Sequence, residues 1–361
     1  MARVYNFSAG PSVLPEWVLQ KAASEMMEYG SSGQSVMEMS HRSSDYQAII
    51  DSCRQSLVDT LHIPEDYEVL FLQGGASTQF AMIPLNLMNG SGRADFVLTG
   101  QWAKKAYQQA AKYGRCNVVA SSEDGVFSYI PQIDVQKLDP QADYLHICYN
   151  NTIYGTRFPT LPSCGSVPLV ADMSSSILSE PIDVSKFGLI YAGAQKNMGP
   201  AGLTVVIIRK DLIGHARDIT PIMLDYKTHA DAGSMYNTPP TYAIYICKLV
   251  LDWLNNEMGG IEQIQKINAQ KAALLYDYLD ESKLFSATVQ GECRSLMNVP
   301  FVTGDKDLDA QFVKEATTQG LVNLKGHRTV GGMRASIYNA MPVKGVQALV
   351  DFMARFEAAH R

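Results

Sequence analysis

Lys196 lies in surroundings that could support covalent chemistry, within the run YAGAQKNMGPAG from Tyr191 to Gly202. It follows a predicted buried strand, its small neighbours leave room for a flat ligand, and no carboxylate occurs within seven positions of it. Such a lysine can have a lowered pKa and act as an amine nucleophile. For an isolated lysine, the alternative is a solvated side chain in a turn.

Asp172 strengthens the chemical interpretation of Lys196. It ends the predicted strand PLVAD, twenty-four residues before Lys196, so we expect both side chains at the carboxyl edge of one sheet. A carboxylate there can bind the protonated nitrogen of a pyridine ring while the lysine holds the same ring covalently. Taken alone, Asp172 would more often cap a helix or a turn.

Two weaker signals belong to the same sheet edge, where ligands of open α/β sheets collect. The turn Gly74–Thr78 joins the predicted strand YEVLFLQ to a helix that we expect from Thr78. Backbone N–H groups at a helix start bind anions, although many strand-to-helix turns look like this one. Trp102 opens the next predicted helix and could stack on a heterocycle, and a core tryptophan is an equally good interpretation.

Between about residues 67 and 210, short apolar runs alternate with helical patterns. The runs are apolar at consecutive positions, which indicates strands covered on both faces, as in a parallel sheet wrapped by helices. Only eleven residues separate Tyr191 from Leu203, and they include Gly199, Pro200 and Gly202, which is too little for a helical crossover. We therefore expect LTVVII to be an antiparallel strand in a mixed α/β sheet.

The pattern changes after Met258-Gly259-Gly260, which reads as a stop signal at a domain boundary. A long proline-free helix follows, and then strand, helix, strand and helix, which is typical of a smaller α+β domain. The length of 361 residues also favours two domains. We expect a large cofactor-binding α/β domain at 15–258 and a small domain at 259–361 that includes the segment 1–14.

Composition excludes several classes of protein. The formal net charge is −6 and no segment concentrates Lys and Arg, which argues against nucleic-acid binding. The longest apolar run, Tyr242–Cys247, is far shorter than the roughly 20 residues of a membrane-spanning helix. The six cysteines never approach C-x-x-C spacing, so we expect reduced thiols, no metal site and a cytoplasmic protein.

Eight strings spread over the whole chain carry a family resemblance. They are NFSAGPS, SVMEMSHRS, LQGGAST, GQWA, VADMSS, YAGAQKNMGPAG, NTPPTYAIY and KGHRTVGGMRASIYNAMP. On these strings the chain resembles the phosphoserine aminotransferases, which are pyridoxal-phosphate enzymes of aminotransferase class V with fold type I. The resemblance implies that α/β fold, with a mostly parallel mixed sheet in the large domain and a smaller α+β C-terminal domain.

The resemblance also implies roles around the cofactor, pyridoxal 5'-phosphate. Lys196 would hold it covalently, Asp172 would bind its pyridinium nitrogen, Trp102 would stack on the ring, and Thr152 would donate a hydrogen bond to the ring hydroxyl. The groups expected around its phosphate are Ala76, Ser77 and Gln195, with Asn237 and Thr238 from a second subunit. The chain would therefore be a homodimer with shared sites.

On the substrate side, the resemblance implies a set of cationic residues. They are His41, Arg42, His327, Arg328 and Arg334. The implied reaction transfers an amino group between glutamate and 3-phosphohydroxypyruvate, giving O-phosphoserine and 2-oxoglutarate in serine biosynthesis, and it leaves open phosphohydroxythreonine in pyridoxine biosynthesis. Two positions depart from the pattern, because Ala9 stands where some relatives carry Ser and Ser77 where others carry Arg.

Two rival functions remain at this point. A cysteine desulfurase or lyase with the same cofactor would need a cysteine nucleophile on a mobile loop, and Cys293 in QGECRS is the candidate. A non-catalytic protein that keeps the fold as a binding scaffold is the other rival, and the pairing of Lys196 with Asp172 argues against it.

Overall fold

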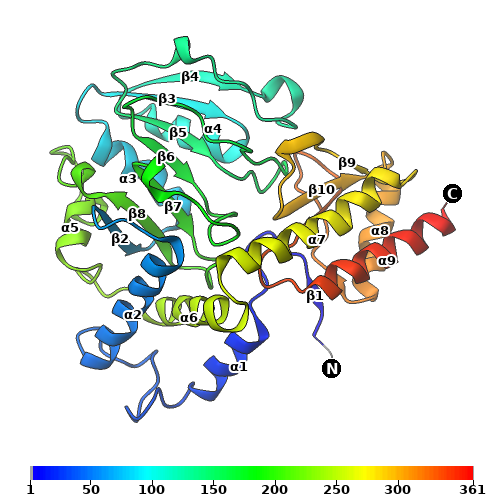
Figure 1. Cartoon of the computed structure of the whole chain (residues 1–361), viewed down its shortest axis with the longest axis horizontal. Coiled ribbons are helices and arrows are strands. Elements are labelled where there is room, and N and C mark those ends of the chain that lie inside the picture. The colour runs from blue at the N-terminus through cyan, green and yellow to red at the C-terminus, as the bar shows by residue number, and fades with distance from the viewer. Residues whose placement is uncertain (1–2, 361) are drawn as a thin grey trace.

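Seven strands form the central sheet of the computed structural model, which describes residues 3–360 (Figure 1). In spatial order they are β2 (Tyr67–Leu72), β8 (Thr204–Arg209), β7 (Leu189–Gly193), β6 (Leu169–Asp172), β5 (Tyr144–Cys148), β3 (Arg93–Leu98) and β4 (Arg115–Ser121). Strand β8 is antiparallel to both of its neighbours, and the other pairs are parallel. The predicted mixed sheet is confirmed, including the reversed strand.

Helices cover both faces of this sheet. Those on one face are α3 (Gly75–Leu87), α4 (Gln101–Ala110) and α5 (Tyr226–Asp231). Those on the other face are α1 (Glu16–Ser24), α2 (Ser44–Leu61) and α6 (Thr241–Asp252). Along β7, Leu189 and Tyr191 pack on the first set, whereas Ile190 and Ala192 pack on the second. Because side chains alternate between two covered faces, consecutive positions of the strand are apolar.

A second, smaller sheet lies beside three helices and has its own hydrophobic core (Figure 1). Its strands are β12 (Met333–Ser336), β10 (Asn298–Val302) and β9 (Ser286–Ala287), paired antiparallel in that order. The helices are α7 (Ile261–Glu281), α8 (Lys306–Thr318) and α9 (Val343–Ala359). These elements follow the predicted helix–strand–helix–strand–helix order, and the two-residue strands β9 and β11 (Leu321–Val322) were not expected.

The start of the described chain joins this second core. Strand β1 (Tyr5–Asn6) pairs in parallel with β11 (Leu321–Val322), and Phe7 is buried among the side chains of α7, α8 and α9. The division at 258 and 259 stays a prediction, and the outer ends of the expected domains, residues 1, 2 and 361, lie outside the described residues.

Gly259 and Gly260 end the helical run of α6, as the sequence indicates. The helix continues through one π-helical turn, Trp253–Glu257, before the two glycines adopt φ values of +79° and +89°. Residues with a Cβ rarely take this left-handed conformation, so the glycines allow the chain to reverse before α7 begins at Ile261.

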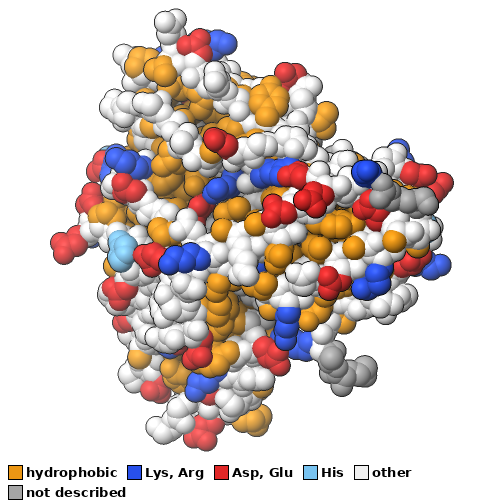
Figure 2. All heavy atoms as spheres, turned by 45° about the vertical axis from the view of Figure 1, so that its right-hand side comes forward, with side chains coloured by type: hydrophobic (Ala, Val, Ile, Leu, Met, Phe, Trp, Pro, Cys, Tyr) orange, Lys and Arg blue, Asp and Glu red, His pale blue; other side chains and the backbone are white. Residues whose placement is uncertain are grey.

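The surface carries charges of both signs. On the face drawn in Figure 2, Lys and Arg side chains are interspersed with Asp and Glu, and no large area of one sign stands out. None of the helices in the described part of the chain is long and apolar enough to cross a lipid bilayer. All six cysteines are free thiols.

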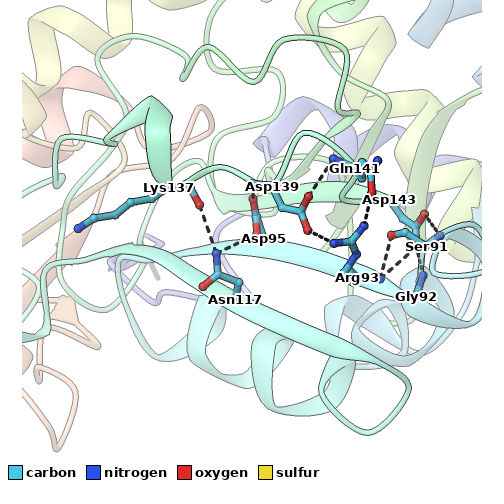
Figure 3. Close-up of polar contacts among 9 residues, drawn as sticks. All are labelled: Ser91, Gly92, Arg93, Asp95, Asn117, Lys137, Asp139, Gln141 and Asp143. Carbon is cyan, nitrogen blue, oxygen red and sulfur yellow. Dashed lines mark hydrogen bonds and ion pairs between the residues drawn. The ribbon is translucent and has the colours of Figure 1, made fainter.

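A polar network ties together the amino ends of strands β3 and β5 (Figure 3). The Asp143 carboxylate, just before β5, accepts hydrogen bonds from the backbone N–H groups of Ser91 (2.8 Å), Gly92 (2.8 Å) and Arg93 (3.3 Å). Asp95, within β3, is buried and accepts a hydrogen bond from the N–H of Asp139 at 2.7 Å. These contacts set the alignment of the two strands at the end opposite the candidate site.

We expect Asp143→Ala to lower the free energy of unfolding by about 1 to 3 kcal/mol, because the backbone donors lose a charged acceptor. Asp143→Asn keeps one acceptor oxygen and should lose less. Urea unfolding of both variants measures the effect. A loss below about 0.5 kcal/mol in the alanine variant would mean that water satisfies these donors equally well.

Candidate active site

A cavity of about 260 Å³ opens at the carboxyl ends of β5, β6 and β7. It is lined by every residue that we expected around the cofactor except Asn237 and Thr238. The expected residues in its wall are Ala76, Ser77, Trp102, Thr152, Asp172, Gln195 and Lys196. The structure therefore brings together residues from the carboxyl ends of five strands, β2, β3, β5, β6 and β7.

Lys196 projects into this cavity from the turn after β7. Its Nζ donates a hydrogen bond to Thr152 Oγ1 at 2.7 Å. Burial lowers the pKa of Lys196, the nearby Asp172 and Cys148 oppose that effect, and the positive charge of Arg334 adds to it. Its amine therefore loses a proton more readily than an exposed lysine does, which favours nucleophilic chemistry.

The backbone around Lys196 is held from outside its own loop. The Ser12 hydroxyl donates to the Lys196 carbonyl, and the Ser12 N–H donates to the Gln195 carbonyl at 2.9 Å. A Cβ added to Gly10 would come within 3.4 Å of Lys196 Cγ. Gly10 and Ser12 therefore lie directly against Gln195 and Lys196.

Asp172 is the last residue of β6 and is 5% exposed. Its Oδ1 accepts a hydrogen bond from the Ser174 N–H at 2.9 Å, and the Ser174 hydroxyl accepts one from the Gly193 N–H at 3.1 Å. These bonds connect the ends of β6 and β7. The carboxylate is thereby held in the wall of the cavity that also contains Lys196.

The turn in which we expected an anion-binding site differs from the sequence expectation in one respect. Helix α3 begins at Gly75 and not at Thr78, because Gly74 and Gly75 adopt φ values of +91° and +64° and turn the chain sharply. A Cβ at Gly74 would lie only 1.9 Å from Thr78 Oγ1, so the turn requires glycine there. The N–H groups of Ala76 and Ser77 consequently lie in the first helical turn, where they have no partner within the helix.

Trp102 also lines the cavity, from the start of α4. Its Nε1 is buried and has no hydrogen-bond partner among the described residues. Lys105 Nζ lies 4.6 Å from the centroid of the indole ring. A buried donor without a partner next to a cavity is consistent with a polar ligand there.

Arg334 approaches the same region from β12. Its Nη1 donates to the Thr152 carbonyl at 3.3 Å, and its buried Nε has no partner among the described residues. Burial lowers the pKa of Arg334. None of these contacts joins the Arg334 guanidinium group to a carboxylate. The group can therefore bind an anionic ligand.

His327 and Arg328 lie in the loop between β11 and β12. Burial lowers the pKa of His327, and the positive charges of Arg334, Arg328 and Lys105 lower it further. His327 is therefore close to Arg334, but both His327 and the exposed Arg328 border a separate cavity of about 670 Å³ beside α8. Neither residue of this pair lines the cavity that contains Lys196.

His41 and Arg42 are not joined to the cavity within one chain. They precede α2, where Arg42 is exposed, and neither lines a cavity described above. In Figure 1 the start of α2 lies across the molecule from β10. The single chain therefore separates this pair from Arg334.

Asn237 and Thr238 lie in an exposed loop that borders a neighbouring cavity of about 320 Å³. That cavity shares Gly74 with the candidate site, and Gln73 Nε2 donates to the Thr238 carbonyl at 3.4 Å. The two side chains are thus near the anion-binding turn but outside the wall of the cavity that holds Lys196.

Sequence reasoning missed several residues in the cavity wall. They are Cys148, Asn150, Ser174, Ser175 and Gly193. Each ends a strand or lies within three residues of its end, and that position was the signal that could have found them. In the described part of the chain, no group of three His, Cys, Asp or Glu side chains is arranged to hold a metal ion.

Comparisons with known proteins show the family to which this chain belongs. The model of the aminotransferase class-V family matches residues 4–349. A phosphoserine aminotransferase of Bacillus cereus is 58% identical over 361 residues, which is 100% of both chains. The solved phosphoserine aminotransferase of Bacillus circulans subsp. alkalophilus is 47% identical, with a TM-score of 0.96 over 99% of each chain.

A pyridoxal-phosphate-bound phosphoserine aminotransferase from Trichomonas vaginalis is more distant, at 39% identity, and still gives a TM-score of 0.93 over 98% of this chain and 100% of that one. The family model and the relatives cover nearly the same residues, and these include the whole cavity wall. The chain is therefore an aminotransferase and belongs to the phosphoserine aminotransferases of the class-V family.

Proposed function

We propose that this protein is a pyridoxal-phosphate-dependent phosphoserine aminotransferase. It would transfer the amino group between L-glutamate and 3-phosphohydroxypyruvate, giving O-phospho-L-serine and 2-oxoglutarate for serine biosynthesis. The observation that carries the proposal is the presence of Lys196 and Asp172 in one cavity wall, with the start of α3 beside them. Because all six cysteines are free thiols, we assign the reaction to the cytoplasm.

The residues of the cavity fit pyridoxal 5'-phosphate. A buried carboxylate, a lysine with a lowered pKa, an unpartnered indole N–H and free N–H groups at a helix start are four features that this molecule could use at once. A solved relative that is 46% identical carries the words "Schiff base in phosphoserine aminotransferase" in its title. When bound, the cofactor supplies an electron sink for the bonds of the substrate α-carbon.

Side chains of this protein would do the rest of the chemistry. Asp172 would keep the ring nitrogen protonated, because a buried anion favours a proton on its partner. Lys196 would hold the cofactor and, once displaced by substrate, carry the α-proton as base and then acid. Thr152 would donate a hydrogen bond to the ring hydroxyl, and Trp102 would stack on the ring.

The phosphate of the cofactor would lie at the start of α3. Ala76, Ser77 and Gln195 line the cavity there, the first two residues lie in the first turn of α3, and the helix dipole favours an anion. Asn237 and Thr238 would complete this site from a second subunit, because within one chain they lie outside the cavity wall.

Two cationic clamps would select the substrates. Arg334 is held by a strand, so its fork would bind the carboxylate that glutamate and phosphoserine share. His327 and Arg328 would bind the distal anionic group, together with His41 and Arg42 of a second subunit. Phosphohydroxythreonine carries the same two anionic groups, so we propose it as a second substrate.

The desulfurase alternative is disfavoured by the position of Cys293. Its Sγ lies 3.5 Å from the Gln290 carbonyl, in a short helical turn, and it borders a separate cavity of about 430 Å³. A nucleophilic cysteine would have to reach the substrate beside Lys196, and Cys293 does not line that cavity.

Borohydride reduction of the yellow protein should fix the cofactor on Lys196. The buried amine with a lowered pKa is the group best suited to bond an aldehyde. Peptide mapping after reduction locates the label, and Lys196→Ala serves as the unlabelled control. A label on a different lysine would contradict the proposal that Lys196 holds the cofactor.

Mixing two inactive variants should restore activity if sites are shared between subunits. Lys196→Ala and the double variant Asn237→Ala, Thr238→Ala would each lose activity, but a hybrid dimer would contain one intact site. Activity after subunit exchange is the measurement, with each variant alone as control. Absence of recovery despite proven exchange would show that the loop serves its own chain.

Arg334→Leu should weaken glutamate and phosphoserine alike, whereas His327→Ala and Arg328→Leu should chiefly weaken phosphoserine. A charge-assisted contact of about 2 to 3 kcal/mol corresponds to roughly 30- to 150-fold in kcat/KM. Arg115→Leu, an exposed arginine at the start of β4, is the matched control and should change neither value.

The deciding quantity is the ratio of kcat/KM for phosphoserine over glutamate. If Arg334→Leu shifts this ratio by about tenfold while the His327 and Arg328 variants leave it unchanged, the two clamps are assigned the wrong way round.

A further inference from the structure

Lys271, on α7, is wholly buried, with an exposed fraction of 0%. Its Nζ donates hydrogen bonds to two successive backbone carbonyls, those of Ile337 (2.9 Å) and Tyr338 (2.7 Å). Neither partner is a carboxylate, and burial lowers the pKa of this lysine to about 7. No residue of the proposed reaction uses this side chain directly.

Burial of a lysine amine is costly for a fold, because the charged form loses its water. A methionine would occupy similar space in the core without that cost. What the lysine supplies, and methionine does not, is a pair of donors that fix the backbone of Ile337 and Tyr338. The contact therefore acts on the position of this segment more than on the packing of α7.

The fixed segment connects Arg334 with the neighbour of Lys196. Strand β12 carries Arg334 and ends at Ser336, so residues 337–339 follow it directly. The Asn339 N–H donates to Asn197 Oδ1 at 3.0 Å. Asn197 is the residue after Lys196, and its Nδ2 donates to the Ile177 carbonyl at 3.1 Å. One short stretch of backbone thus connects the strand that carries Arg334 with the residue next to Lys196.

Helix α7 holds this stretch at a second point. Asn268, one turn before Lys271, donates to Asn339 Oδ1 at 2.9 Å and to the Ser179 carbonyl at 3.0 Å. Asn339 Nδ2 donates to the Leu178 carbonyl at 2.7 Å. Asn268, Asn339 and Asn197 are 0%, 4% and 6% exposed, so water does not compete for these bonds.

We propose that Lys271 is a positioning residue for transamination: by holding residues 337–339 it sets the spacing between Arg334 and Lys196. The proposal rests on the proposed function, in which Arg334 binds the substrate carboxylate and Lys196 moves the α-proton. The carboxylate and the α-carbon are adjacent in every amino-acid substrate. A displacement of about 1 Å between the two residues can therefore cost up to roughly 100-fold in rate.

The test compares Lys271→Met with Lys266→Met, an exposed lysine on the same helix. Lys271→Met should lower kcat/KM for glutamate and for phosphoserine by the same factor, on the order of tenfold or more, because both substrates use the same spacing. Lys266→Met should leave both values unchanged. Asn268→Ala removes one contact to Asn339 and leaves the lysine, so it should lower kcat/KM for both substrates equally but by a smaller factor. It replaces Lys271→Met if that variant does not fold.

Hydrogen exchange supplies a second measurement that does not depend on turnover. In the full-length protein, with and without pyridoxal phosphate, Lys271→Met should speed amide exchange both in 335–341 and in 193–199. Lys266→Met should speed it in neither. This readout decides whether the two segments are coupled even if the protein proves to have another activity, so the two proposals can fail separately.

Two results would overturn the positioning role. The first is a folded Lys271→Met protein that melts at a lower temperature but keeps wild-type kcat and KM, with unchanged exchange in 193–199. The second is an unequal loss for the two substrates, because the spacing between Arg334 and Lys196 serves both.

Discussion

The reaction that we propose depends on the partial burial of one amine. Burial lowers the pKa of Lys196, while Asp172 and Cys148 limit that fall. For these opposing effects on the pKa, a lysine and a carboxylate must lie at the ends of neighbouring strands and line one cavity. The parallel strands β5, β6 and β7 provide this, because their carboxyl ends meet at a single edge of the sheet.

The rest of the site follows from geometry at the same edge. Gly74 and Gly75 adopt left-handed backbone conformations and let α3 start beside the cavity, which puts unpaired N–H groups where an anion can lie. Ser174 then links the ends of β6 and β7 by hydrogen bonds and keeps the Asp172 carboxylate in place. The positions of the cavity residues are thus set mainly by where the strands of the central sheet end.

Arg334 depends on a different set of contacts, because it comes from the smaller sheet. Asn150 Nδ2, after β5, donates to Asn298 Oδ1 at 2.9 Å, and Asn298 Nδ2 donates to the Tyr338 hydroxyl at 3.1 Å. That hydroxyl donates to the Ala9 carbonyl at 2.8 Å. This chain of buried polar groups joins the two sheets and the start of the chain, so the position of the arginine is fixed by partners from distant parts of the sequence.

The sequence by itself determined the local features: the apolar runs that became strands, the reversed strand β8, the glycine stop after α6, and the candidacy of Lys196 and Asp172. These follow from periodicity, from short connections and from strand ends, all of which are properties of neighbouring residues. Only the tertiary structure decided that Asn150 and Ser174 share the cavity wall, that His41 lies apart from Arg334 within one chain, and that Lys271 is buried against two carbonyls. Such pairings join residues far apart in the sequence, and their formation depends on how the sheets pack, which no local pattern encodes.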